Sequence, residues 1–166
     1  MIDAGYALQM ARYNRWQNEI LYKVAGALSE EERRRERGAF FGSIHATLNH
    51  LLWADRTWMS RFTKIPKPEG GITQSVALHE GWEELKRERA AFDAVIVDWA
   101  EGLDPAWTQG DLTWYSGAAQ RDMTKPKSVL VLHFFNHQTH HRGQVHCMLT
   151  QAGVKAHVTD LMAMPD

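Results

Sequence analysis

The chain has 166 residues, of which 44% are hydrophobic and 23% charged, and its formal net charge at neutral pH is −1. These values are typical of a soluble globular protein with a substantial core, so we expect residues 1–166 to form a single domain. The balanced charge argues against a nucleic-acid partner or a membrane-surface partner.

Cysteine content and the first residues predict the compartment. Cys147 is the only cysteine, so no disulfide can form within the chain, which favours a reducing environment. The opening residues "MIDAGYALQMARYNRWQ" lack the basic start and apolar stretch of a signal peptide, and no segment is apolar over the length of a membrane span. We therefore expect a cytoplasmic protein.

The first half of the chain predicts two helices. The first spans roughly 3–28, where apolar residues recur every three or four positions. The run "EEERRRER" at 30–37 has nearly cancelling charges and indicates a solvated helix end or loop. The second helix runs from Ser43, a favourable N-cap, to Phe62. The prolines and glycines of "KIPKPEGGIT" at 64–73 rule out a continuous helix beyond it.

The second half predicts two more helices. The third spans about 75–102 and opens at Ser75, and the fourth spans about 127–151, after Pro126 and before Gly153. Between them, residues 112–115 favour a strand and 116–117 a turn, which indicates a short hairpin or an ordered loop over the helices. The prediction is an all-α four-helix bundle with a longer, partly irregular connection between the third and fourth helices.

The fourth predicted helix concentrates histidine. Five of the nine histidines of the chain lie between 133 and 146. At about 100° per residue, five polar side chains share an arc of roughly 100° on one helix face: His133, His137, His140, His141 and Gln144. Apolar residues extend this stripe at either end, so the face is expected to point inward, and His146, outside the arc, is expected at the surface or an edge.

A metal ion is one way to satisfy such a stripe. His137 and His141 are four residues apart and can share one ion, although this spacing alone is a weak signal. In the second helix, His50 lies among apolar residues, and its neighbours on the same face are small: Thr47, Ala54 and Thr57. Core histidines that only form hydrogen bonds are the alternative. The three together favour a metal site, and three neutral imidazoles without a thiolate suit zinc or nickel with an open coordination position.

The histidine spacing excludes one enzyme class. Zinc proteases of the His-Glu-x-x-His type use the glutamate as a general base. Here Gln138 stands in its place and cannot accept the proton. Peptide hydrolysis by that mechanism is not expected.

Several motifs together resemble the DinB (DinB/YfiT-like) family. The segments are "TLNHLLWADRTWMSRF" at 47–62 and "LHFFNHQTHHRGQVHCML" at 132–149, the latter being the most specific, with "ARYNRWQNEIL" at 11–21 and "GVKAHVTDLM" at 153–162. The resemblance spans nearly the whole chain. It implies a four-helix bundle that binds a divalent metal ion through His50, His137 and His141, and commonly a homodimer. Some family members transfer low-molecular-weight thiols such as bacillithiol or mycothiol, or isomerise substrates with such a thiol as cofactor.

Other residues of the motif receive separate interpretations. His133, His140 and Gln144 are candidates to line a pocket or support the metal ligands. Arg142 is read either as an anchor for a substrate carboxylate or as a partner in a salt bridge, and Gly143 as a site of close helix packing. Trp114 and Tyr115 are candidates for a pocket mouth.

Three functions are compatible with these observations. The first is a metal-dependent transferase that acts on a small-molecule substrate with a low-molecular-weight thiol. The second is a non-catalytic protein that binds metal or a small ligand in a stress response, favoured by the lack of a clear acid–base carboxylate. Metal-assisted hydrolysis is a weaker third alternative. No individual catalytic residue is predicted.

Overall fold

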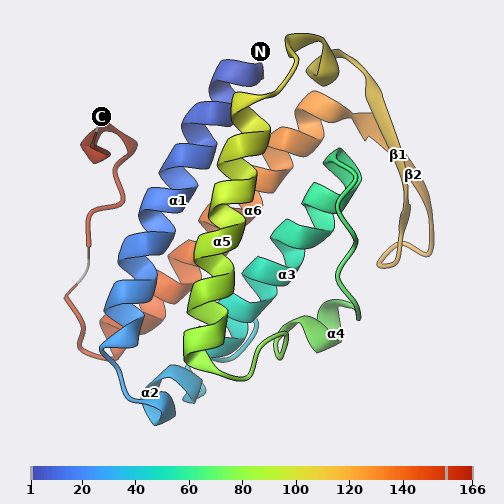
Figure 1. Cartoon of the computed structure of the whole chain (residues 1–166). Helices are drawn as coiled ribbons and strands as arrows, with labels where there is room; N and C mark the ends of the chain where they lie inside the picture. The colour runs from blue at the N-terminus through green and yellow to red at the C-terminus, as the bar shows by residue number, and fades with distance from the viewer. Residues whose placement is uncertain (1, 156, 166) are drawn as a thin grey trace.

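The computed structural model describes residues 2–155 and 157–165 and is mostly helical, as expected (Figure 1). Four helices are long and two are short, and a two-stranded antiparallel hairpin precedes the last helix. Their bounds are α1 Ala4–Gly26, α2 Glu30–Arg34, α3 Ile44–Phe62, α4 Ile72–Ser75, α5 Trp82–Glu101, β1 Asp111–Ser116, β2 Arg121–Pro126 and α6 Lys127–Gln151. Short 3-10 turns occupy Pro105–Gln109 and Leu161–Ala163.

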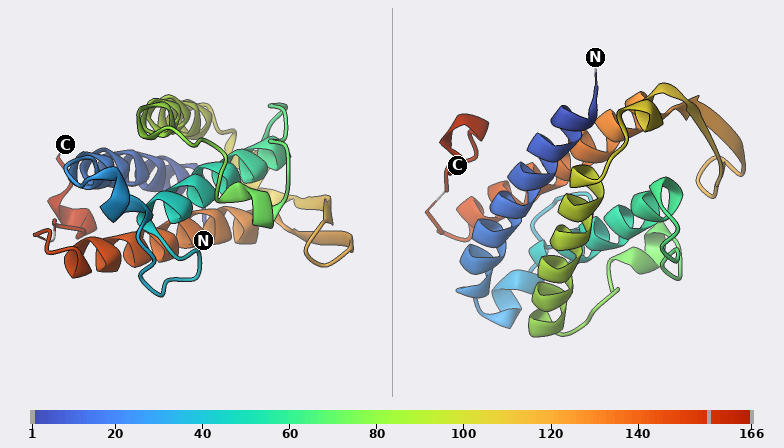
Figure 2. Two further views of the ribbon diagram at one scale, coloured as in Figure 1. Left: turned by 90° about the horizontal axis from the view of Figure 1, so that it is seen from below. Right: turned by 45° about the horizontal axis from the view of Figure 1, so that its top comes forward.

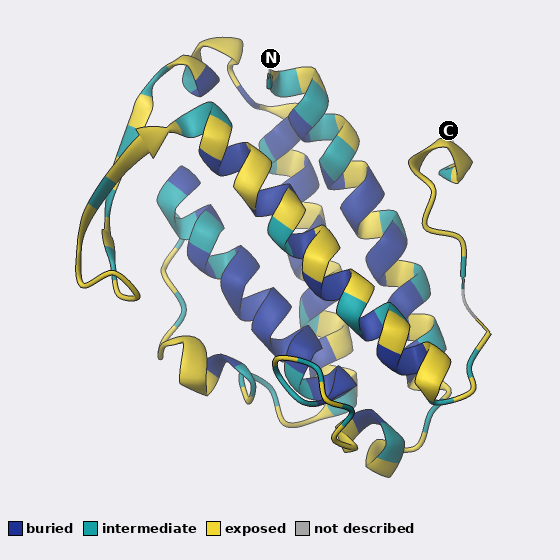
Figure 3. Cartoon of the chain, turned by 180° about the vertical axis from the view of Figure 1, so that it is seen from behind, coloured by how far each residue is buried: buried dark blue, intermediate teal, exposed yellow. Residues whose placement is uncertain are grey.

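The four long helices pack against one another around one core. Helix α1 contacts α5 and α6, and α3 contacts the same two helices (Figures 1 and 2). Their inner faces are buried while their outer faces alternate between exposed and half-buried residues (Figure 3). The largest fully buried side chains in this core include Leu21, Leu48, Leu85, Phe134 and Phe135.

The predicted ranges of three helices, α1, α3 and α6, agree closely with the structure. Ser43 caps α3, its hydroxyl accepting a hydrogen bond from the Ala46 N–H at 3.2 Å. Helix α6 spans the predicted 127–151, and Gly153 follows it with a φ of +77°, a left-handed conformation that favours glycine. Helix α1 ends two residues earlier than predicted, and the charged run after it forms the short helix α2.

The predicted start of the third helix is wrong. Ser75 is the last residue of α4, and α5 begins only at Trp82. Between them, the His79 N–H donates to Asn49 Oδ1 at 2.7 Å, and the His79 carbonyl oxygen pairs with His45 Nε2 at 3.1 Å. Because α3 side chains bind the backbone groups that a continuous helix would use, the chain stays non-helical here.

The predicted hairpin is present. Strands β1 and β2 pair antiparallel, with Asp111 opposite Pro126 and Ser116 opposite Arg121. Trp114 packs on Trp58 of α3 at 5.7 Å between ring centroids, whereas Tyr115 is 61% exposed. The hairpin therefore contacts the helices through Trp114 and leaves Tyr115 at the surface.

A buried ionic group joins three of the helices. Arg89 of α5 pairs with Asp55 of α3 at 2.7 Å and with Asp93 at 2.9 Å. The Asp93 carboxylate also accepts hydrogen bonds from Asn14 and Asn18 of α1, at 3.0 and 2.9 Å. All five residues are buried. Apolar periodicity could not locate this group, because polar residues in a helix ordinarily indicate the solvent face.

Within the residues described, no helix combines the length and the apolar character needed to cross a membrane.

Candidate metal centre

Three histidines from two helices converge on one point. His50 of α3 and His137 and His141 of α6 each offer one ring nitrogen, and these nitrogens all lie within 4.8 Å of one another. The ring centroids are 5.0 Å apart for His50 and His141, 5.4 Å for His50 and His137, and 4.5 Å for His137 and His141. The contact between α3 and α6 therefore brings together the three residues that the sequence singled out.

The predicted inward face of α6 is only partly buried. Going round the arc, His140 and His133 are exposed, Gln144 and His137 are half-buried, and His141 is buried. The arc thus crosses the boundary between solvent and core, and the expectation of a wholly inward face is wrong. A site at this boundary has one side open to small molecules and the other held by the core.

Ser75 orients the ring of His50. The His50 Nδ1 lies 2.8 Å from the Ser75 hydroxyl oxygen, and that hydroxyl donates its own hydrogen to the Ile72 carbonyl oxygen at 2.6 Å. Since the serine hydrogen is already committed, Nδ1 of His50 must be the donor in this pair. The Nε2 atom of His50 is then left with a free lone pair, which is the form that binds a metal ion.

Gln144 has the same role toward His141. Its amide oxygen lies 2.8 Å from His141 Nδ1, and its amide nitrogen lies 3.2 Å from His140 Nε2. With the amide in this orientation, Gln144 accepts from His141 and donates to His140. The lone pair of His141 is therefore on Nε2. The structure places Gln144 and His140 beside the three-histidine group.

His137 provides the test of whether this group fits a metal ion. Its Nδ1 is buried and has no hydrogen-bond partner among the described residues. Leaving a buried polar atom unpaired costs about 1–3 kcal/mol. A cation coordinated at this position would remove that cost, and three imidazoles suit a divalent transition ion such as zinc, copper or nickel. The donor set of the group therefore fits such an ion.

The electrostatics keep all three rings neutral. Burial, with the charge of His141 as the second cause, lowers the pKa of His50 to about 4. Burial and the neighbouring histidines, His141 first among them, lower the pKa of His137 to about 3. Burial also lowers the pKa of His141. Neutral imidazole is the metal-binding form, so burial favours the metal-binding form of all three rings.

Phe41 covers one side of the group. Its ring stacks on His50 with 3.9 Å between centroids and lies 5.4 Å from His141. The loop that carries it is held by a backbone bridge between Ala39 and Gly42, and Gly42 has a φ of +76°. Phe41 was not among the predicted site residues, although an aromatic pair between glycines just before a helix is a usable signal. Ser75 was not predicted to orient His50 either, because the local sequence contains no signal for that role.

His133 lies farther along α6, toward the hairpin. Its ring is 5.8 Å from that of His137 and 4.9 Å from that of Trp58. Trp58 in turn contacts Trp114 of β1, and the guanidinium of Arg61 lies 4.3 Å from the Trp58 ring. His133 and Trp114 thus belong to an aromatic surface beside the three histidines.

Three other residues of the motif lie away from the group. Arg142 is buried, but among the described residues it makes no salt bridge and instead donates to Asn14 Oδ1 and Thr139 Oγ1. A Cβ atom built on Gly143 would meet no described atom within 4 Å, so the prediction of close helix packing there is wrong. His146 is half-buried against His157, at 4.9 Å between rings. All three motif residues line a pocket whose lining includes none of the three histidines.

The fold and this site together define a mostly helical protein with a three-histidine group able to hold a divalent transition ion. Comparison with known proteins assigns the chain to a family. The model of the DinB family matches residues 1–166. The chain is also 27% identical over 169 residues to Protein DinB of Bacillus subtilis (strain 168), a match covering 95% of this chain and 92% of that protein. The chain belongs to the DinB family.

Proposed function

We propose that His50, His137 and His141 bind one divalent transition ion, with zinc and nickel as the favoured metals. The observation that carries this proposal is the convergence of three neutral imidazoles. Two of them are each oriented by a hydrogen bond, His50 to Ser75 and His141 to Gln144. Three protein ligands without a fourth are typical of sites that leave a coordination position for a substrate.

We further propose that the protein is a metal-dependent transferase that uses a low-molecular-weight thiol on a small-molecule substrate. A bound ion would act as a Lewis acid that lowers the pKa of a group brought to it. The histidine group contains no carboxylate to serve as general base. A thiol, with a pKa of about 8.5, needs far less help to lose its proton than water, at about 15.7, so the donor set favours a thiol over hydrolysis.

The surrounding residues have separate parts in this proposal. Ser75 and Gln144 hold the rings of His50 and His141 so that Nε2 of each ring is free for the metal ion. Phe41 excludes water from one side of the group. His133 and His140, which are exposed beside it, line the approach for the substrate.

A thiol-transfer assay tests this function. Zinc- or nickel-loaded protein is mixed with bacillithiol, mycothiol or coenzyme A and a chromogenic aryl halide, and formation of the thioether is followed. We expect turnover that depends on metal and is lost in His50→Ala but kept in His146→Ala, whose histidine lies outside the group. Equal rates for His50→Ala and the wild type would contradict the proposal.

The alternative is a non-catalytic protein that binds metal or a small ligand in a stress response. The stacking of Phe41 on His50 favours it, because a covered ion is held rather than presented. This alternative predicts tight metal binding without turnover of any thiol. Metal-assisted hydrolysis remains the weaker third candidate, since the three-histidine group contains no carboxylate.

The remaining proposals concern the whole molecule. We propose that the four long helices form the four-helix bundle of the family as a single domain, that the protein is cytoplasmic, and that it is a homodimer. Several large apolar side chains on the outer surface support a self-association, among them Phe40 at 79% exposed and Met162 at 94% exposed. Light scattering at micromolar concentration should give twice the chain mass of 19.0 kDa, and a mass near 19.0 kDa would contradict the dimer.

A further inference from the structure

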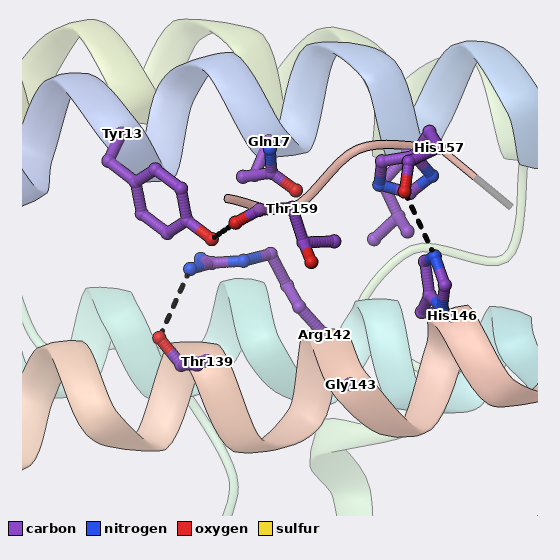
Figure 4. Close-up of a pocket in the computed structure, with 9 residues that line it drawn as sticks. Tyr13, Gln17, Thr139, Arg142, Gly143, His146, His157 and Thr159 are labelled. Atoms are coloured by element: carbon purple, nitrogen blue, oxygen red, sulfur yellow. Dashed lines mark hydrogen bonds between the residues drawn. The ribbon is translucent and has the colours of Figure 1, made fainter. Parts of the chain in front are cut away.

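A pocket lies between α1 and α6 under the C-terminal segment, and the residues that line it include none of the three histidines of the candidate metal centre (Figure 4). Its volume is about 310 Å³. Helix α1 contributes Tyr13, Gln17 and Leu21, and α6 contributes another part of the wall. The segment 157–159 forms the remaining side.

The C-terminal segment is attached across this pocket by its backbone. The Tyr13 hydroxyl donates to the Thr159 carbonyl oxygen at 2.5 Å, and Gln17 Nε2 donates to that of Val158 at 3.1 Å. On the α6 side, His146 Nε2 lies 3.3 Å from the His157 carbonyl oxygen (Figure 4). Three side chains from two helices therefore hold a segment that has no regular structure of its own. These hydrogen bonds keep the segment in place over the pocket.

The pocket wall contains a buried guanidinium, that of Arg142, which no described carboxylate contacts directly. Arg142 is 6% exposed and forms no salt bridge with the described residues. Arg89, buried to a similar degree, pairs with two carboxylates. An arginine guanidinium remains cationic at neutral pH. Asp55 and Asp93 act on this charge only at longer range, so the guanidinium keeps donors for a directly bonded carboxylate.

The Arg142 guanidinium has hydrogen-bonding capacity to spare. It carries five N–H donors, and only two bonds to described side chains are present, one to Asn14 Oδ1 and one to Thr139 Oγ1. Its carbon lies 5.5 Å from the centre of the Tyr13 ring, so the planar group is held between α1 and α6 (Figure 4). Such a fixed fork matches the two oxygens of a carboxylate.

We propose that this pocket binds a small organic monocarboxylate, whose carboxylate group pairs with the Arg142 guanidinium. The volume supports an organic ligand over a simple ion, because one water occupies about 30 Å³ and ligand pockets begin at about 300 Å³. Leu21 and the Tyr13 ring provide apolar wall for the body of such a ligand. A single guanidinium balances the one charge of a carboxylate better than the two charges of a phosphate.

Calorimetric titration of metal-free protein, with chelator present, tests the proposal without involving the histidine group. Benzoate is the probe, and benzamide, which has nearly the same shape without the charge, is its control. We expect saturable binding of benzoate in the millimolar range, at least about tenfold tighter than benzamide, as one charge-assisted contact provides. Inorganic phosphate should bind more weakly than benzoate.

Variants locate the binding. Arg142→Met keeps the bulk of the side chain and should lower benzoate affinity at least about tenfold, whereas Arg87→Met, which removes a positive charge from the exposed side of α5, should leave it unchanged. If Arg142→Met does not fold, Gly143→Leu replaces it, because Gly143 lines the pocket and has free space beyond its Cβ position. Leucine there should weaken benzoate binding, and Gly143→Ala should preserve it.

Three results would overturn the proposal. One is the absence of saturable benzoate binding up to about 20 mM, far above the expected dissociation constant. Another is equal affinity for benzoate and benzamide, or undiminished affinity in the folded Arg142→Met or Gly143→Leu protein. The third is tighter binding of phosphate than of benzoate, which would assign the pocket to a different anion. None of these outcomes depends on the metal or on transferase activity.

Discussion

At the scale of single residues, Ser75 decides which nitrogen of His50 is free. Its hydroxyl accepts from Nδ1 at 2.8 Å while donating to Ile72, so the imidazole has one tautomer and one orientation. A histidine without such a partner can rotate and change tautomer. Each additional state that cannot bind the metal lowers the metal affinity. The short helix α4 thus contributes to the candidate metal centre through the hydrogen bond of Ser75 to His50.

Substitution of Ser75 by alanine should therefore lower zinc affinity by about 10- to 100-fold without unfolding the protein. Competition titration with a chromogenic chelator measures the change, and circular dichroism of the metal-free protein checks the fold. Ser75→Thr keeps the hydroxyl and should restore most of the affinity. Ser60→Ala, which removes a hydroxyl bonded only within α3, is the matched control. If both alanine variants bind zinc like the wild type, the role assigned to Ser75 is wrong.

The lowered pKa values of the histidines predict an unusual pH profile. With a pKa of about 4 for His50 and about 3 for His137, the folded rings stay neutral when the pH drops below 6.5. Zinc affinity should then fall by less than about tenfold between pH 7.5 and 5.5. Three rings with ordinary pKa values near 6.5 would lose about a thousandfold, since each would be about nine-tenths protonated at pH 5.5. Isothermal titration across this range distinguishes the two outcomes.

The same lowered pKa values predict that the metal-free protein loses stability as the pH falls. Unfolded imidazoles take up protons near pH 6.5, whereas the folded rings of His50 and His137 do so only at lower pH. Their contribution to the free energy of unfolding is therefore present above about 6.5 and is lost progressively as the pH falls toward the folded values.

At the scale of elements, the buried ionic group ties α5 to α3 and, through Asp93, to α1. Arg89 is the one cation in direct contact with both carboxylates among the described residues. The polar side chains give these three helices a unique relative placement, because a shift of either neighbour would leave a buried charge unpaired.

Replacing Arg89 by methionine should lower the free energy of unfolding by roughly 3–5 kcal/mol, because two buried carboxylates lose their partner. Urea unfolding followed by circular dichroism gives this value. Arg87→Met, two residues away on the exposed side of α5, removes only a surface pair and should cost less than about 1 kcal/mol. A similar small loss for both variants would show that the buried group does not hold the helices together.

At the scale of the whole molecule, the candidate metal centre should link metal binding to folding. His50 and the pair on α6 come from helices that meet only in the folded chain. An ion bound there binds the folded state far better than the unfolded one. The metal would therefore act as a clamp between α3 and α6.

Metal at a hundredfold over its dissociation constant should add about 2.7 kcal/mol of stability. For a chain of this size, that corresponds to an increase in melting temperature of roughly 5–10 °C. His141→Ala should abolish the metal-dependent increase, and His146→Ala should keep it. Melting curves with zinc, with nickel and with chelator provide the measurement. An equal increase in His141→Ala and wild type would mean that other residues hold the ion.

Local sequence determined much of this protein. Apolar spacing, the N-cap at Ser43 and the glycine at 153 are properties of neighbouring residues, so the helices α3 and α6 could be predicted nearly to the residue. The interval between His137 and His141 placed both on one helix face for the same reason. The small side chains around His50 made it the third candidate before any contact between helices was known.

Only the tertiary structure decided the features that depend on contacts between distant segments. The break before α5 exists because His79 bonds to α3, and the tautomer of His50 follows from Ser75, 25 residues away. Arg142 is next to His141 in sequence, and the 100° turn between neighbours places it on another helix face. That this face meets α1 and lines the pocket under the C-terminal segment is seen only in the folded chain. Local pattern cannot supply such facts, because it records the face on which a side chain lies and not what lies opposite.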